Sequence, residues 1–202
     1  MAIDKIQSES INLADNFAFT GTVTGTSDII NLGSTTISTP VSQVAIDSSV
    51  ITSDIKHLEV RFGDFTPSTT HGHLGFSTST NNGSSFNTQY YTRAYFNTFN
   101  TGTPSWTIDG NVSGGFMLDD VKGTLDTLTG GNGILQIMNI QGSGTKFATT
   151  SSFTRNSHNS NWYGYFAHTR IDTTGTINYL KLFDFVESGN LQTGKFDFYG
   201  YK

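Results

Sequence analysis

The sequence predicts an all-β protein: an antiparallel, jelly-roll-like β-sandwich with an extended N-terminal arm. Thr, Ser, Asn and Gly make up 91 of the 202 residues, and aromatic side chains reach 13%. Thr and aromatic residues favour pleated strands, whereas Gly and Asn supply turns. Short apolar stretches alternate with turn clusters, and no stretch of about a dozen residues repeats its apolar side chains with a helical period.

The predicted strands follow one another from residue 57 onward. In residues 57–62, three apolar side chains alternate with Glu59 and Arg61, which is typical of a strand with one buried and one solvated face. Residues 80–85 predict a hairpin turn, because Asn-Gly accepts two successive positive φ angles. One helical turn is expected only at residues 121–128. Further strands are expected at residues 74–78, 89–99, 105–109, 115–121, 133–140, 148–154, 163–172, 176–185 and 194–201.

Residues 1–45 differ from the rest of the chain, because their apolar side chains occur singly or in pairs among Thr, Ser and Gly. We interpret them as an extended arm that packs on a partner, with Phe17, Phe19 and Val23 as the anchoring side chains. The alternative is a tail without a role. Residues 46–202 then form the sandwich domain.

Composition excludes several classes of function. The formal net charge is −5 with only 11 Lys and Arg residues, which argues against nucleic-acid binding. No apolar run approaches the roughly 18 residues of a membrane span, and the N-terminus lacks the apolar segment of a signal peptide. The absence of cysteine removes disulfides, thiolate nucleophiles and Cys-ligated zinc.

His71 and His73 are the sharpest metal-like feature of the sequence. Histidines at i and i+2 of a strand lie on the same side and can chelate a divalent ion. They stand beside a turn, however, and their spacing assigns no third ligand. We therefore expect solvated turn histidines, and neither a metal nor any other cofactor is predicted.

Acidic residues give no catalytic pair. A glycosidase needs two carboxyl groups facing each other at about 5–9 Å. Asp119 and Asp120 are adjacent, so on a strand they point in opposite directions. Combinations of Asp109, Asp172 and Glu187 stay open. Motifs for a nucleophile elbow, a phosphate loop or a dinucleotide site are absent from the sequence, so an enzyme is not expected.

A run of amides and aromatics at residues 155–166 is the best candidate for binding. Aromatic rings with neighbouring amides can stack on sugars, which would define a glycan platform. Strand alternation places Trp162 and Phe166 on one face. Tyr163 and Tyr165 then lie on the opposite face, so only one pair can face solvent. The alternative, which the sequence favours, is a polar loop leading into a core strand. The candidate glycan-binding residues are Asn159, Asn161, Trp162, Tyr163 and Tyr165.

Two parts of the sequence resemble recurrent segments of tailed-bacteriophage virion proteins. The first runs Val60-Arg-Phe-Gly-Asp-Phe-Thr-Pro-Ser-Thr69, Leu74-Gly-Phe-Ser-Thr78 and Asn82-Gly-Ser-Ser-Phe86, with Thr70-His71 where the family has Asp-Gly. The second is the C-terminal Ser188-Gly-Asn-Leu191 turn and Gly194-Lys-Phe-Asp-Phe-Tyr-Gly-Tyr-Lys202 strand, with Lys195 and Phe198 in place of Thr and Leu. Residues 11–25 are similar to leader segments of structural proteins from marine phages.

This resemblance covers about a third of the chain and carries no functional residue. It implies a capsid-decoration or fibre protein of the virion, whose partners are other virion proteins, further copies of the chain (a trimer by resemblance) and host-surface glycans. A stand-alone carbohydrate-binding module and a polysaccharide hydrolase are the alternatives.

Overall fold

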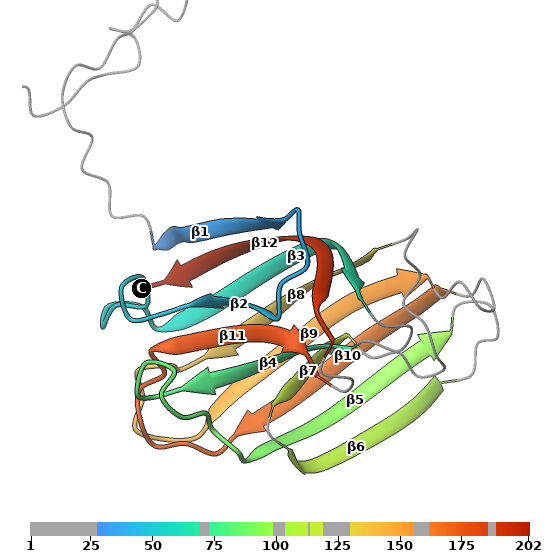
Figure 1. Cartoon of the computed structure of the whole chain (residues 1–202). Helices are drawn as coiled ribbons and strands as arrows, with labels where there is room; N and C mark the ends of the chain where they lie inside the picture. Colours follow the sequence, from blue (N-terminus) through green and yellow to red (C-terminus); the bar gives the residue numbers. More distant parts are fainter. Residues whose placement is uncertain are drawn as a thin grey trace, which may run out of the picture.

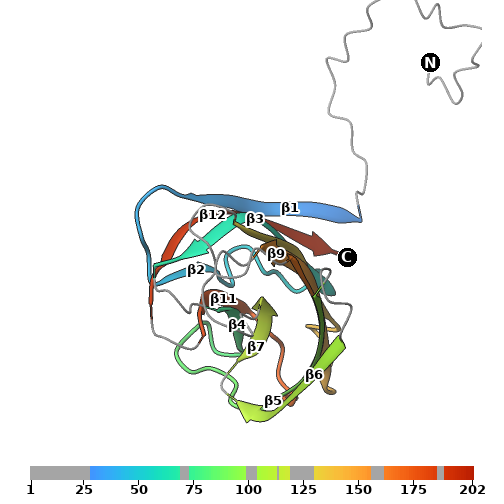
Figure 2. The same ribbon diagram turned by 90° about the vertical axis from the view of Figure 1, so that its right-hand side faces the viewer.

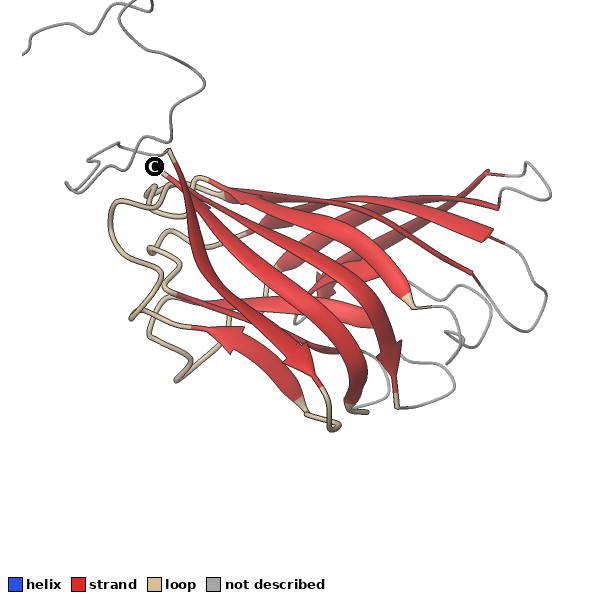
Figure 3. Cartoon of the chain, turned by 90° about the horizontal axis from the view of Figure 1, so that it is seen from above, coloured by secondary structure: helices blue, strands red, loops and turns tan. Residues whose placement is uncertain are grey.

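The computed structural model describes residues 28–68, 73–98, 104–112, 114–118, 130–155, 162–185 and 189–202. Within these ranges all regular elements are strands (Figure 3), and no helix there has the length and apolar character to cross a membrane. The predicted all-β class is therefore confirmed. The strands are β1 (Ile29–Ile37), β2 (Gln43–Ile46), β3 (His57–Pro67), β4 (Leu74–Ser79), β5 (Tyr90–Thr98), β6 (Pro104–Val112), β7 (Gly115–Leu118), β8 (Gly131–Met138), β9 (Lys146–Arg155), β10 (Trp162–Ile171), β11 (Tyr179–Asp184) and β12 (Leu191–Tyr201).

The strands form two antiparallel sheets that face each other. The large sheet has the order β1-β12-β3-β8-β9-β10-β5-β6, and the small sheet has the order β2-β11-β4-β7 (Figure 1). The large sheet curves around the small one, so that it has a concave inner face and a convex outer face (Figure 2). This arrangement is the predicted β-sandwich.

Eight of the strands follow jelly-roll topology. In the series β1, β2, β3, β4, β7, β8, β11 and β12, successive strands lie in opposite sheets except for β4 and β7, which pair within the small sheet. Strands from the two ends of the chain pair as β1 with β12 and β2 with β11. This wrapping of a long hairpin produces the two Greek keys of a jelly roll. Two inserted hairpins, β5–β6 and β9–β10, widen only the large sheet. As a result β8, β9 and β10 are interior strands, paired on both sides.

The sandwich begins earlier in the chain than predicted. Strands β1 and β2 lie within the segment assigned to the arm, yet β1 pairs with β12 over Ile29–Ile37 and β2 pairs with β11. The predicted boundary between residues 45 and 46 is therefore wrong, because residues 29–46 belong to both sheets. Phe17, Phe19 and Val23 lie outside the described residues, as does the helical turn expected at residues 121–128.

The predicted turn at residues 80–85 has the expected backbone but a different role. Asn82 and Gly83 both have positive φ, 55° and 83°, as predicted for Asn-Gly. The turn does not join a hairpin, however, because β4 belongs to the small sheet and β5 to the large one. It is instead one of the crossings between the two layers.

Alternation along each strand fills the space between the sheets. On β3, Leu58, Val60 and Phe62 point inward and are at most 5% exposed, as predicted from their spacing. Phe62 stacks on Phe196 of β12 with 6.4 Å between ring centroids. The side chains at intervening positions of β3 and β12 are thereby directed to the outer face of the large sheet.

Candidate functional site

Exposed apolar side chains gather on one face of the molecule. In the part of the chain that the structure describes, eight large hydrophobic side chains are exposed, and strand register places all eight on the outer face of the large sheet. Single exposed apolar residues are ordinary, but a group of this kind on one face indicates a binding surface. The eight are Ile29, Tyr91, Ile134, Met138, Phe147, Phe153, Trp162 and Phe166.

Strand β9 forms the floor of a groove on this face. Its outward positions carry small side chains, Thr149 and Ser151, in the middle and phenylalanine at both ends. Ser151 stands opposite Ile134 of β8 on one side and Phe166 of β10 on the other. The larger side chains of β8 and β10 therefore rise on both sides of a low central strand. We call this feature the β9 groove.

The apolar end of the β9 groove is a depression of about 640 Å³. Phe153 and Trp162 contact each other there, with 6.2 Å between ring centroids and 42° between ring planes. Phe153 faces Gly164 across β9 and β10, and Gly164 has no side chain to fill the space beside the ring. Phe166 and Ile134 complete the walls. This end offers two adjoining aromatic rings that are 43–48% exposed.

The polar end of the β9 groove adjoins the apolar end. A second depression, of about 230 Å³, shares Ile134, Ser151 and Phe166 with the first and adds Gln136, Thr149 and His168. The described residues that line the two depressions include no Asp, Glu, Lys or Arg. The β9 groove thus combines aromatic surface with uncharged hydrogen-bonding groups.

A buried carboxylate fixes one wall of the polar end. Glu59 lies on the outer face but is only 4% exposed. It accepts hydrogen bonds from Gln136 Nε2 at 2.8 Å, from Arg61 Nε at 2.7 Å and from the Tyr201 hydroxyl at 2.8 Å. Burial raises the pKa of Glu59, but these three donors together outweigh it and hold the pKa below its usual value. The Gln136 amide is therefore oriented by an ionised partner.

Three ion pairs lie elsewhere on the outer face among the described residues. Arg61 bonds to Glu59 and lies 4.8 Å from the Tyr199 ring centroid. Lys195 pairs with Asp197 at 3.1 Å, which leaves strands β12 and β3 as a charged, internally paired region beside the apolar strands. Near β5, Arg170 pairs with Asp172 at 2.9 Å and covers the Tyr91 ring.

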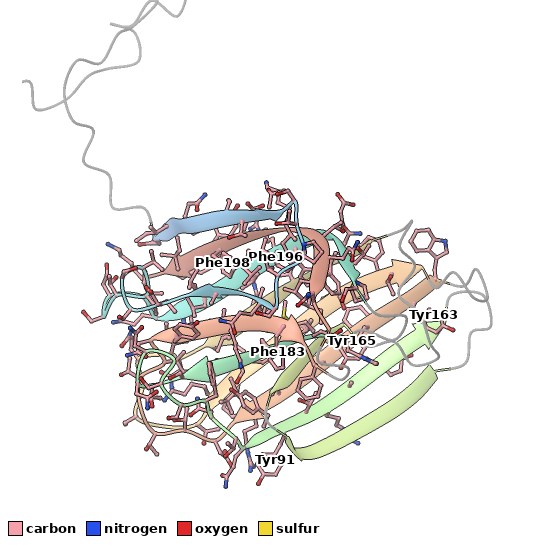
Figure 4. All side chains as sticks on the ribbon, in the orientation of Figure 1. Tyr91, Tyr163, Tyr165, Phe183, Phe196 and Phe198 are labelled. Carbon is pink, nitrogen blue, oxygen red and sulfur yellow. The ribbon has the colours of Figure 1, made fainter. Side chains whose placement is uncertain are left out.

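The structure divides the predicted glycan-binding residues. Trp162 is exposed in the β9 groove, whereas Tyr163 and Tyr165 (Figure 4) are only 6% and 2% exposed. Both tyrosines belong to a buried cluster with Ala94 and Ala167. Their inclusion was wrong, because strand alternation turns them away from solvent. Asn159 and Asn161 lie outside the described residues.

Sequence reasoning missed most of the groove. Phe153, Ser151, Thr149, Ile134 and Gln136 come from two other strands, and the sequence assigned no role to any of them. Alternation in residues 146–155 already places two phenylalanines on one face of that strand. Only the pairing of β8, β9 and β10 shows that this face adjoins Trp162.

The other candidate residues are not assembled into a site. At His73 the backbone N–H donates to Asp184 Oδ1 at 3.1 Å, which anchors the start of β4, while His71 lies outside the described residues. Among the described residues, no three His, Cys, Asp or Glu side chains are grouped to hold a metal ion. Asp119, Asp120 and Glu187 lie outside the described residues, and only the strand position of Asp109 on β6 is described.

Comparison with known proteins adds no family to this geometry: no protein-family model, no curated protein and no solved structure gives a significant match to the chain.

Proposed function

We propose that this protein is a structural component of the surface of a tailed-phage virion, a capsid-decoration or fibre protein, that binds through the outer face of its large sheet. The observation that carries the proposal is the collection of all eight exposed large hydrophobic side chains of the described chain on that face. The jelly roll supports it, since this fold recurs in viral capsid and lectin domains.

Because one fold serves many functions, the properties of the outer face indicate the function more closely than the jelly roll does. The outer face carries an aromatic groove on three interior strands, and its neighbouring charges are paired within the chain. Such a face is stable without a cofactor and is already shaped for a ligand. These properties suit a protein that displays a binding surface rather than one that performs chemistry.

Attachment to the particle is assigned to the N-terminal segment. Residues 1–27 precede β1, which is an edge strand of the large sheet. Phe17, Phe19 and Val23 are the proposed anchors on another virion protein. Addition of a strand to a partner sheet requires only backbone groups and alternating side-chain pockets. A cyclic homo-oligomer, a trimer in the first instance, is part of the proposal.

The proposal is tested on intact particles. Antibodies against the purified full-length chain are used for immunogold labelling of particles from the phage that encodes it. We expect labelling of the particle exterior and recovery of the chain with purified particles. Particles that lack the chain, in infected cells that produce it, would contradict the proposal.

A stand-alone carbohydrate-binding module is the second candidate, and the β9 groove favours it. Such a module binds sugars as a monomer and does not co-purify with particles. Sedimentation of the purified chain, together with the particle assay above, separates the two candidates.

A further inference from the structure

We infer that the β9 groove binds an uncharged oligosaccharide in an extended conformation, with one sugar ring on the Phe153–Trp162 pair and the next units over Ser151 and Thr149. This inference deepens the proposed function, because it names the ligand class of the same face.

The shape of the groove favours a narrow chain as its occupant. Its floor is one strand wide, and its walls stand on β8 and β10, about 10 Å apart at strand spacing. The groove runs along β9 from Phe153 to Thr149, which is about 13 Å. The flat face of a second copy would rest on Ile134 and Phe166 and leave the floor empty. A chain one sugar ring wide reaches it.

The chemistry of the lining matches a sugar chain. A pyranose has an apolar C–H face and hydroxyl groups around its edge. The exposed rings of Phe153 and Trp162 provide an apolar surface for the former. Ser151, Thr149 and Gln136 provide hydroxyl and amide groups for the latter. Mostly apolar walls with a few placed polar groups are typical of small-ligand sites.

The uncharged lining of the two depressions favours a neutral ligand. The described residues that line both depressions include no Asp, Glu, Lys or Arg. Glu59 and Arg61, which stand opposite Gln136 and Ile134 on the adjoining strand, are bonded to each other. An acidic or cationic sugar would therefore lose hydration without gaining a counter-ion among the described lining residues, which lowers its affinity.

The site is organised before the ligand arrives. Its residues stand on interior strands rather than on loops, and the Gln136 amide is held by Glu59 at 2.8 Å. Little side-chain ordering is then needed on binding, which favours affinity.

The test uses the full-length purified chain on immobilised neutral gluco-, galacto- and mannooligosaccharides, with sialylated and uronic-acid oligosaccharides beside them. We expect binding to at least one neutral series and at least tenfold weaker binding to the acidic ones. Phe153→Ala should weaken binding at least tenfold. Phe147→Ala is the matched control, because Phe147 lies on the same face of β9 and is 52% exposed, but stands beyond Thr149 and lines neither depression. It should change binding less than twofold.

A second variant keeps the inference testable if Phe153→Ala fails to fold. Ser151→Leu fills the floor while leaving both aromatic rings in place, and it should abolish binding without lowering the melting temperature. The face would instead join copies of the chain if Phe153→Ala and Phe147→Ala weakened oligosaccharide binding equally and the wild-type protein formed a dimer that both variants dissociate. Preference for acidic sugars, or no binding to any series, would also overturn the inference. Particle association is scored separately, so its failure leaves this result standing.

Discussion

Trp162 and Phe153 meet across β9 and β10, 6.2 Å apart at their ring centroids, and together they form the aromatic end of the β9 groove. Both rings are more than two-fifths exposed, so neither is explained by packing in the core. Their neighbours on the inner side of the same strands are almost fully buried. Replacing a residue on each side of β10 therefore separates a binding role from a structural one.

Trp162→Ala should weaken binding to host cells or neutral oligosaccharides while the melting temperature stays within about 4 °C, because an exposed side chain contributes little to stability. Tyr165→Ala is the contrasting variant. Tyr165 is 2% exposed, so its truncation should cost about 3–5 kcal/mol and lower the melting temperature by more than about 6 °C. Thermal melts and binding assays on the two variants check both statements. A large loss of stability from Trp162→Ala would mean that its ring supports the core.

The sequence was sufficient to predict that Trp162 and Tyr163 face opposite ways, since alternation needs only the strand. It was not sufficient to predict which of them faces solvent. That depends on which face of β10 packs against β7 of the small sheet, a contact between distant parts of the chain. The sequence-based preference for a core strand holds for Tyr163 and Tyr165 but not for Trp162.

Strands β1 and β2 were missed for a related reason. In β1 only Ile37 is buried and the other inward positions are half-buried, while a bulge near Gly33 interrupts its register, so the sequence of this strand shows no clean apolar alternation. Its partner β12 lies at the opposite end of the chain. Local patterns therefore found the interior strands and overlooked an edge strand whose stability comes from a distant partner.

The position of β1 gives a prediction on truncation. Removal of residues 1–27 should leave a folded sandwich, because all described strand pairs remain. The truncated protein should no longer join particles, because it lacks the proposed anchoring side chains. Removal of residues 1–46 deletes the edge strands β1 and β2 and leaves the backbone groups of β12 and β11 that paired with them without partners. This longer truncation should fail to give a cooperative thermal transition. Circular dichroism melts and particle-incorporation assays on the two truncated proteins check these expectations. Normal incorporation of the protein that lacks residues 1–27 would contradict the proposed anchoring role.

Glu59 predicts a pH-dependent contribution to stability. Its pKa is lowered in the folded state, so the ionised carboxylate stabilises the protein above its unfolded pKa of about 4.3. This contribution is lost as the pH falls through the lower folded pKa. Glu59→Gln should cost about 2 kcal/mol at pH 7, or about 4–8 °C in melting temperature.

The difference between wild type and Glu59→Gln should then shrink as the pH is lowered from 5 to 3. Thermal melts at several pH values measure this difference in stability. Asp54→Asn, at an exposed ion pair, is the control. Lys202 and Thr52 hold the pKa of Asp54 at about 2, but this carboxylate is exposed and its ion-pair partner Lys202 is the C-terminal residue. A difference for Glu59→Gln that stays constant with pH would contradict the assignment.

Lys146 is a buried cation held by backbone groups. It is 0% exposed, and its ammonium donates to the carbonyl oxygens of Gly142, Gly144 and Thr173. Lys146→Met keeps the apolar stem but leaves three carbonyl groups without this donor, so it should cost about 2–4 kcal/mol. Lys181→Met is the control, since Lys181 is only half-buried and lies over the Phe86 ring. Chemical denaturation of the two variants checks the difference, and equal stabilities would contradict it.

The central claim, that the outer face of the large sheet is a binding face with its site in the β9 groove, is tested most directly by mapping a ligand on the protein. Full-length ¹⁵N-labelled chain is titrated with the neutral oligosaccharide that binds best, and backbone amide shifts are followed by NMR. The account predicts shifts concentrated at Ile134, Gln136, Ser151, Phe153, Trp162 and Phe166. Shifts concentrated on β1, β2 or the small sheet, or none at saturating ligand, would contradict it.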